Sequence, residues 1–162
     1  MAGENEQANA NTGKDLILTR RFDAPAQIVY KAWTDGKQLA AWWGPKDFTN
    51  PVCEIDVMPG GEINIDMKGP DDKVYPMSGV FHEIIDAEKL VFTTAAFKDA
   101  EGNWQLEVMN TVEFADEDGM TKLTLHASVL KQNEEVKSSV DGMEKGWNES
   151  LDRLAVLIPK KK

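Results

Sequence analysis

Residues 120–158, MTKLTLHASVLKQNEEVKSSVDGMEKGWNESLDRLAVLI, contain the pattern that decides the fold. The first part alternates apolar and polar residues, as a strand with one buried face does. From residue 133 the apolar residues recur every three or four positions, which is the spacing of one helix face. We therefore predict a strand and then a helix over Asn133–Ile158, about 26 residues and roughly 39 Å long. The apolar helix face consists of Val136, Val140, Met143, Trp147, Leu151, Leu154 and Ile158.

The chain before this helix reads as one strand, two short helices and a run of six strands. The β-rich first strand starts at Asp15, and Asp35 is placed to cap the second short helix, which Gly44 and Pro45 end. Residues 52–130 are strand segments separated by five turns and contain no helix-length segment. Seven strands then share one long helix. This order predicts an α+β domain in which a curved antiparallel sheet grips that helix.

Six motifs occur along the chain in a characteristic order. They are APAQIVYKAWTD with WWGP, MPGG, YPMSGVFHEI, EKLVFTT, MTKLTLHAS and DGMEKGWNESLDRLA. In order and spacing they resemble the helix-grip domains of the START/Bet v 1-like (SRPBCC) superfamily, in the branch named after the activator of Hsp90 ATPase, the bacterial AHSA1-like proteins. The resemblance implies a seven-stranded sheet around a C-terminal helix. It also implies an apolar cavity between them that takes lipids, polyketides, hormones or other apolar molecules.

The composition predicts one folded domain with an acidic surface. Of 162 residues, 41% are hydrophobic and 28% are charged, and the formal net charge is −10. Such a charge disfavours binding to nucleic acid and to anionic membranes. The apolar segments are too short to span a membrane and the N-terminus lacks the pattern of a signal peptide, so we expect a cytoplasmic protein. We expect a disordered tail over residues 1–13, a single domain over 14–159 and a basic tail over 160–162.

The sequence offers no signature of a metal site, a disulfide or a nucleophilic enzyme. Cys53 is the single cysteine, and with His82 and His126 it forms no metal-ligand spacing. We therefore predict no metal and no cofactor. Gly-rich phosphate loops and GxSxG elbows are also lacking from the sequence, which disfavours nucleophilic catalysis.

A ligand cavity is predicted where the concave sheet face meets the long helix. Trp43 matches the family position beside Gly-Pro and is predicted to line or gate the cavity mouth, the alternative being that it only seals the short helices against the sheet. Helix residues Met143, Trp147 and Leu151 are the expected roof of the cavity. Methionines suit an adaptable apolar pocket, although they also fill ordinary cores. Asn110 turns inward by strand parity, so its amide needs a ligand, a buried water or a backbone partner. The full predicted lining is Trp43, Met67, Met77, Phe81, Phe92, Val108, Asn110, Leu125, Met143, Trp147 and Leu151.

Two local features leave alternatives open. Gly142 and Gly146 lie inside the predicted helix, where each costs about 1 kcal/mol relative to alanine, so either the helix packs closely on the sheet or the cavity needs the room. In GVFHEI, either Phe81 and Glu83 face inward, or Val80, His82 and Ile84 do.

Three functions are compatible with these patterns. The leading prediction is a small protein, monomeric or homodimeric, that binds an apolar molecule such as a lipid, a polyketide or an aromatic compound. The second is a cyclase or hydrolase in which His82, Glu83 or Asn110 moves a proton. The third is a co-chaperone or stress-response partner of Hsp90 type.

Overall fold

The computed structural model describes residues 15–132 and 142–158. The predicted tails and the first part of the predicted long helix, including Val136 and Val140, lie outside these residues. The elements in chain order are β1 (Asp15–Phe22), α1 (Ala26–Thr34), α2 (Gly36–Trp42), β2 (Thr49–Ile55), β3 (Glu62–Lys68), β4 (Val74–Ile85), β5 (Lys89–Lys98), β6 (Trp104–Glu117), β7 (Met120–Lys131) and α4 (Met143–Leu157).

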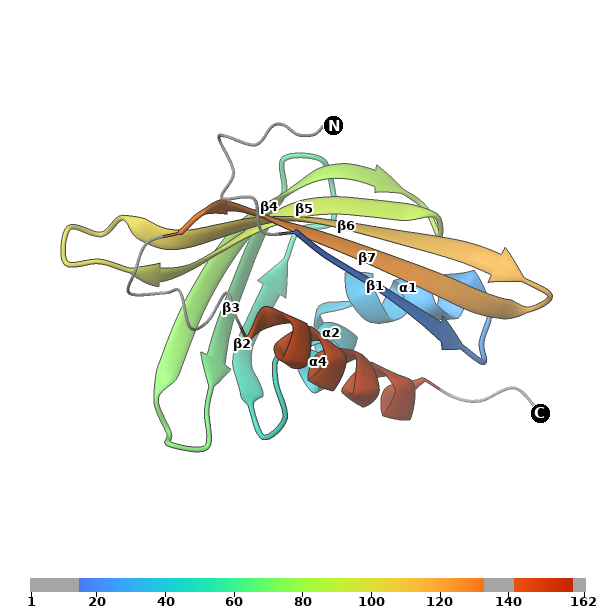
Figure 1. The fold of residues 1–162 in the computed structure, drawn as a ribbon, viewed down its shortest axis with the longest axis horizontal. Coiled ribbons are helices and arrows are strands. Elements are labelled where there is room, and N and C mark those ends of the chain that lie inside the picture. Colours follow the sequence, from blue (N-terminus) through green and yellow to red (C-terminus); the bar gives the residue numbers. More distant parts are fainter. Residues whose placement is uncertain (1–14, 133–141, 159–162) are drawn as a thin grey trace.

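The strands form one seven-stranded sheet in the order β1-β7-β6-β5-β4-β3-β2, with every pair antiparallel. The run from β2 to β7 is a meander, and β1 pairs with β7 to form the edge of the sheet opposite β2. Figure 1 shows the sheet arched over α4, with α1 and α2 on the same side. The predicted α+β helix-grip architecture is confirmed.

A β-bulge in β4 answers the question of which residues of GVFHEI face inward. Phe81 pairs with Phe92 and Glu83 pairs with Val91, so His82 is the extra residue. After this residue the inward-facing positions of β4 shift by one. As a result Phe81 is buried and Ile84 also packs against the core, while His82 and Glu83 are exposed. The first alternative is therefore right for Phe81 and wrong for Glu83, and the second is right for Ile84 and wrong for His82.

The two short helices begin and end where local chemistry predicts. Pro25 is the residue before α1, where its fixed φ suits a helix start. Asp35 caps α2, and its carboxylate accepts a hydrogen bond from the Lys37 backbone N–H at 3.1 Å. Both helices bury tryptophans against the sheet: Trp33 is 2% exposed and Trp42 is fully buried.

Helix α4 has fifteen residues and begins at Met143. Gly142 is its N-cap, so the prediction that this glycine lies inside a helix is wrong. The Arg20 guanidinium on β1 holds one side of α4, with Nη2 lying 2.8 Å from Asp152 Oδ1 and donating to the Asn148 carbonyl at 3.1 Å. On its other side α4 packs against α2. The helix therefore has a fixed position under the sheet.

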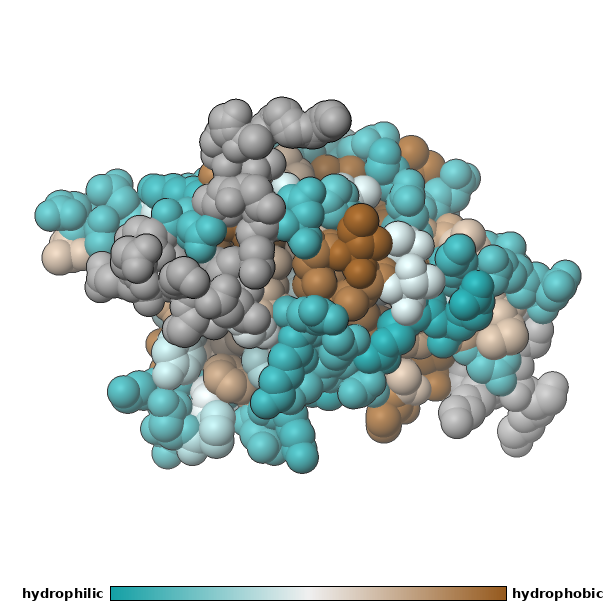
Figure 2. Space-filling view, viewed as in Figure 1, coloured by the Kyte–Doolittle hydropathy of each residue, from teal (hydrophilic) through white to brown (hydrophobic). Residues whose placement is uncertain are grey.

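The outer surface is mostly hydrophilic, in agreement with the acidic composition (Figure 2). Apolar atoms gather over β1 and the strands beside it on the face shown, and Ile17 on β1 is 65% exposed. The other large apolar side chains of the described residues pack mainly on the concave face. The fold thus turns its apolar surface toward α4.

Candidate functional site

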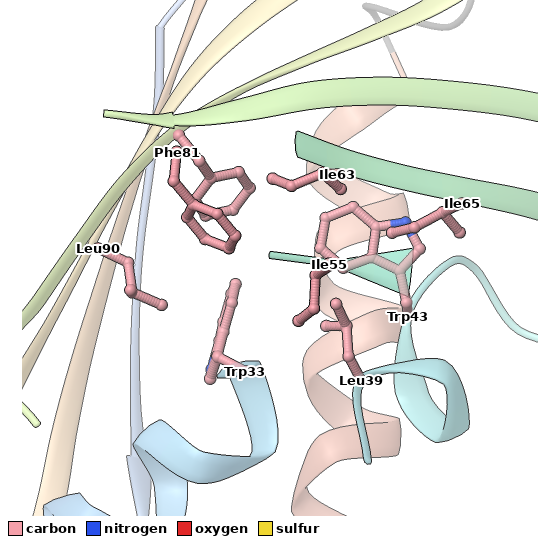
Figure 3. Close-up of a pocket in the computed structure, with 9 residues that line it drawn as sticks. Trp33, Leu39, Trp43, Ile55, Ile63, Ile65, Phe81 and Leu90 are labelled. Carbon is pink, nitrogen blue, oxygen red and sulfur yellow. The ribbon is translucent and has the colours of Figure 1, made fainter. Parts of the chain in front are cut away.

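The concave face of the sheet is divided into a filled half and an open half. In the filled half, apolar side chains from α1, α2 and strands β2 to β5 point toward one another, and the space left between them is about 10 Å³ (Figure 3). Since that is about the volume one water needs, this half is core and has no room for a ligand. The side chains are those of Trp33, Leu39, Trp43, Ile55, Ile63, Ile65, Phe81, Leu90 and Phe92.

The open half is a cleft of about 570 Å³ between the sheet and the N-terminal part of α4. This volume lies in the usual range for small-molecule sites, and most of the lining is apolar. Its floor is made by Met67, Tyr75, Met77, Thr94, Ala96, Lys98, Leu106, Val108 and Asn110, among others. Its roof is Gly142, Met143, Gly146, Trp147 and Ser150, and the segment from Trp43 to Phe48 forms a wall.

Trp43 is the boundary between the two halves, since its ring lines both. Its indole Nε1 donates to Met77 Sδ at 3.2 Å, and its ring meets that of Trp147 edge-on, with centroids 5.4 Å apart and planes at 83°. Trp147 in turn stacks on Trp33 at 6.0 Å. The inner end of the cleft is therefore closed by the rings of Trp43 and Trp147, and Trp147 is supported by its stacking on Trp33.

The wall segment is held in place by side chains that satisfy its backbone carbonyls. Asn50 Nδ2 donates to the carbonyls of Ala40 and Trp43, at 2.9 and 2.8 Å. From α4, the Arg153 guanidinium donates to four carbonyls of the segment from Ala41 to Pro45 at 3.0–3.2 Å. Burial lowers the pKa of this guanidinium, but arginine stays charged at neutral pH. The positive charge lies at the C-terminus of α2, which the helix dipole favours.

Small residues at the N-cap and in the N-terminal part of α4 leave the cleft open. Gly142, Gly146 and Ser150 recur every four positions and all line it. A Cβ added at Gly146 would meet only Pro45 Cγ, at 4.0 Å. Close packing of the helix on the sheet therefore does not explain the glycine at position 146. The structure supports the other explanation that the sequence allows, namely that the cleft needs the room.

Asn110 is the one buried amide in the cleft lining. It is 1% exposed, and its Nδ2 donates to the Phe92 carbonyl at 3.3 Å and to Thr94 Oγ1 at 3.2 Å. Its Oδ1 is buried and has no hydrogen-bond partner among the described residues. The backbone partner that the sequence allows thus satisfies the amide nitrogen, and the carbonyl oxygen stays available.

Of the eleven predicted lining residues, seven line the cleft: Trp43, Met67, Met77, Val108, Asn110, Met143 and Trp147. The other four do not. Phe81 and Phe92 belong to the filled half, whereas Leu125 and Leu151 are fully buried in the core. Phe81, Phe92 and Leu125 lie on the concave face of the sheet and Leu151 lies on α4, and all four pack in the core cluster that includes side chains of α1 and α2.

Sequence reasoning missed part of the lining. Tyr75 shares the inward parity of Met77, and Lys98 shares that of Thr94 and Ala96, so alternation in β4 and β5 could have found both. Phe48 and Phe97 gave no such signal, because Phe48 precedes a strand and Phe97 has a positive φ of 62° at the end of β5.

The two residues of GVFHEI considered for proton transfer lie away from the cleft. His82 is exposed and its Nε2 lies 3.4 Å from Thr93 Oγ1, while Glu83 Oε1 lies 3.4 Å from Lys89 Nζ. Neither lines the cleft, so neither is placed to move a proton there. Residues 15–132 and 142–158 contain no group of three metal-ligating side chains and no helix long and apolar enough to cross a membrane. Burial raises the pKa of the Cys53 thiol to about 11, which makes it a poor nucleophile at neutral pH.

Comparison with known proteins gives a family. The family model described as Activator of Hsp90 ATPase homolog 1-like protein (AHSA1) matches residues 23–158. The chain belongs to this family. The match includes α1, α2, α4 and every strand except β1, and it confirms the resemblance seen in the sequence motifs. No curated protein matches the chain.

Solved structures of similar proteins share the AHSA1-family fold. Protein NE0264 from Nitrosomonas europaea is 25% identical with a TM-score of 0.73, and the match covers 88% of this chain and 92% of that one. Protein CV1439 from Chromobacterium violaceum is 22% identical with a TM-score of 0.77, over 91% and 99%. The AHSA1 protein from Silicibacter pomeroyi is 24% identical with a TM-score of 0.71, over 88% and 95%.

Proposed function

We propose that this AHSA1-family protein binds a small apolar molecule in the cleft between the sheet and α4. The observation that carries the proposal is the open, largely apolar cleft of about 570 Å³ beside a core that is already filled. A domain that needed only stability would gain by covering such a surface, since apolar surface left in water forgoes the free energy of burial. Family membership supports the same role, because AHSA1-like proteins belong to a ligand-binding or co-chaperone class.

Gly146 offers a test with a matched control. Gly146→Leu extends an apolar side chain from the roof into the cleft, whereas Gly146→Ala adds only a Cβ for which there is room. Both replace glycine by a good helix former, so both should keep or raise stability. Binding of the amphiphilic dye anilinonaphthalene sulfonate, whose aromatic rings bind apolar surfaces, should be unchanged in Gly146→Ala and at least tenfold weaker in Gly146→Leu when followed by its fluorescence. Equal dye affinity in two equally stable variants would contradict the proposal.

An enzymatic function finds less support. Of the three residues considered for proton transfer, Asn110 alone lines the cleft, and an amide is not a general acid or base at neutral pH. The cyclase or hydrolase alternative is therefore the weaker proposal.

A co-chaperone role is the second candidate, and the family description favours it. It predicts concentration-dependent binding to purified Hsp90 and a change in the Hsp90 ATPase rate. Gly146→Leu separates the two roles, because a cleft ligand would be lost in this variant while a surface contact with Hsp90 would remain. Cytoplasmic location and a monomeric or homodimeric state stay predictions.

A further inference from the structure

We propose that the cleft ligand is an elongated apolar acid that carries a hydrogen-bond donor, with the donor on Asn110 Oδ1 and the acid group facing Lys98. This inference rests on the proposed function and names the chemical class of the ligand. Two polar groups on the cleft floor and the apolar surface between them support it.

The first group is the amide of Asn110. Its orientation is fixed, because the Phe92 carbonyl accepts a hydrogen bond and can therefore face only Nδ2. The remaining Oδ1 is a buried acceptor without a partner among the described residues, on a side chain that lines the cleft. A buried acceptor that stays unsatisfied destabilises the fold. A ligand hydroxyl or N–H group would satisfy it.

The second group is the ammonium of Lys98. Among the described residues that line the cleft, Lys98 is the only charged one. Its Nζ lies 4.8 Å from the ring centroid of Trp104, its cross-strand neighbour, and the side chain is exposed. A cation at this place, in a chain of formal net charge −10, gives a local attraction for an anionic ligand group.

The surface between the two groups is apolar and long. Asn110 pairs with Phe92 and Trp104 pairs with Lys98, and the strand pairs between them are Thr94 with Val108 and Ala96 with Leu106. From these pairs, Asn110, Thr94, Val108, Ala96, Leu106 and Lys98 all line the cleft. From the first pair to the last the distance along β5 is about 20 Å at 3.3 Å per residue. An extended long-chain carboxylic acid with a distal hydroxyl group has this shape.

The test compares palmitate, ω-hydroxypalmitate and the methyl ester of ω-hydroxypalmitate by titration of the intrinsic tryptophan fluorescence. Trp43 and Trp147 line the cleft, so an occupied cleft should change their emission. The wild-type protein should bind ω-hydroxypalmitate about tenfold more tightly than palmitate and more tightly than the ester. High salt should reduce the difference in affinity between ω-hydroxypalmitate and its methyl ester, because Lys98 is exposed and its charge is screened.

Two variants assign each preference to its residue. Asn110→Leu should abolish the preference for the hydroxyl group and keep the preference for the acid, and Lys98→Gln should do the reverse. The proposal is overturned if wild-type protein binds palmitate and ω-hydroxypalmitate equally, a comparison that needs no variant. It is also overturned if either preference survives the loss of its residue.

The test separates this inference from the proposed function. If all three compounds bind equally and Gly146→Leu blocks them, the cleft binds apolar molecules but the ligand class is wrong. If none of them binds and the dye does not bind either, both proposals are wrong.

Discussion

Replacing Arg153 by methionine should destabilise the domain by removing the contact between α4 and the wall segment. The guanidinium donates to the carbonyls of Ala41, Trp43, Gly44 and Pro45 at 3.0–3.2 Å. Methionine keeps an apolar side chain of similar length, so the packing of the stem is largely preserved. The decrease in the free energy of unfolding therefore measures mainly the contribution of the hydrogen bonds.

The magnitude follows from the donor count. Nη1 faces three of the four carbonyls but carries two protons, so the guanidinium makes about three effective hydrogen bonds. Hydrogen bonds to charged groups are worth about 1.5–3 kcal/mol each. Their total contribution is smaller here, because these carbonyls are partly exposed to water. We expect the free energy of unfolding to fall by about 2–4 kcal/mol, and the affinity for cleft ligands to fall because Trp43 and Pro45 line the cleft.

Urea unfolding followed by tryptophan fluorescence measures this loss, and an unchanged m-value would show that the unfolded state is unaffected. Arg153→Lys keeps the charge but not the planar fork, so it should recover about half of the loss. Lys145→Met removes an exposed cation on the same helix whose distance to Glu149 is 3.9 Å, and it should change stability by less than about 0.5 kcal/mol. A loss below about 1 kcal/mol for Arg153→Met, or equal losses for all three variants, would refute the reasoning.

Three further predictions concern single residues. Gly79→Ala should lower the free energy of unfolding by more than about 3 kcal/mol or abolish folding, because the added Cβ would overlap the Thr93 carbonyl oxygen. Urea unfolding measures this loss, and a variant as stable as the wild type would contradict the contact. Cys53 has a pKa of about 11 because of burial, so iodoacetamide should modify the folded protein slowly at neutral pH and faster as pH approaches 11. The unfolded thiol ionises near its ordinary pKa of about 8.5. The free energy of unfolding should therefore fall as pH rises from about 8.5 toward 11, which urea unfolding at several pH values would detect. Trp147→Ala should lose about 3 kcal/mol and weaken dye binding, because it removes the ring that contacts Trp33 and Trp43; an equally stable variant with unchanged binding would exclude Trp147 from the site.

The fold was predictable because its signals are local and agree with one another. Period-two alternation marks the strands, turn residues separate them, and Asp35, Gly44 and Pro45 bound the second helix. The start of α4 was not predictable in this way, since the apolar spacing runs without a break through Gly142, which is the N-cap. The bulge at His82 was not predictable either, because parity assumes a regular pairing.

The candidate site was predictable only in part, because alternation gives the side of the sheet and not the position along it. Phe92 and Asn110 are cross-strand neighbours on the concave face, yet Phe92 packs in the filled half and Asn110 lines the cleft. Whether a concave-face residue is buried or lines the cleft depends on how far the rings of Trp33 and Trp43 extend over the sheet. These rings come from α1 and from the C-cap of α2. Contacts of this kind, between segments far apart in the chain, leave no periodic trace in the sequence.

The division of the concave face has a consequence for how this domain can change over generations. Residues such as Leu125 and Leu151 keep the chain folded, and they are not the residues that line the cleft. Substitutions at exposed lining residues such as Val74 can therefore alter the shape of the cleft at little cost in stability, because they leave the core beside it intact. The same separation makes the domain a practical scaffold for directed evolution. A library would vary the floor and roof of the cleft and leave Trp43 and Trp147 unchanged.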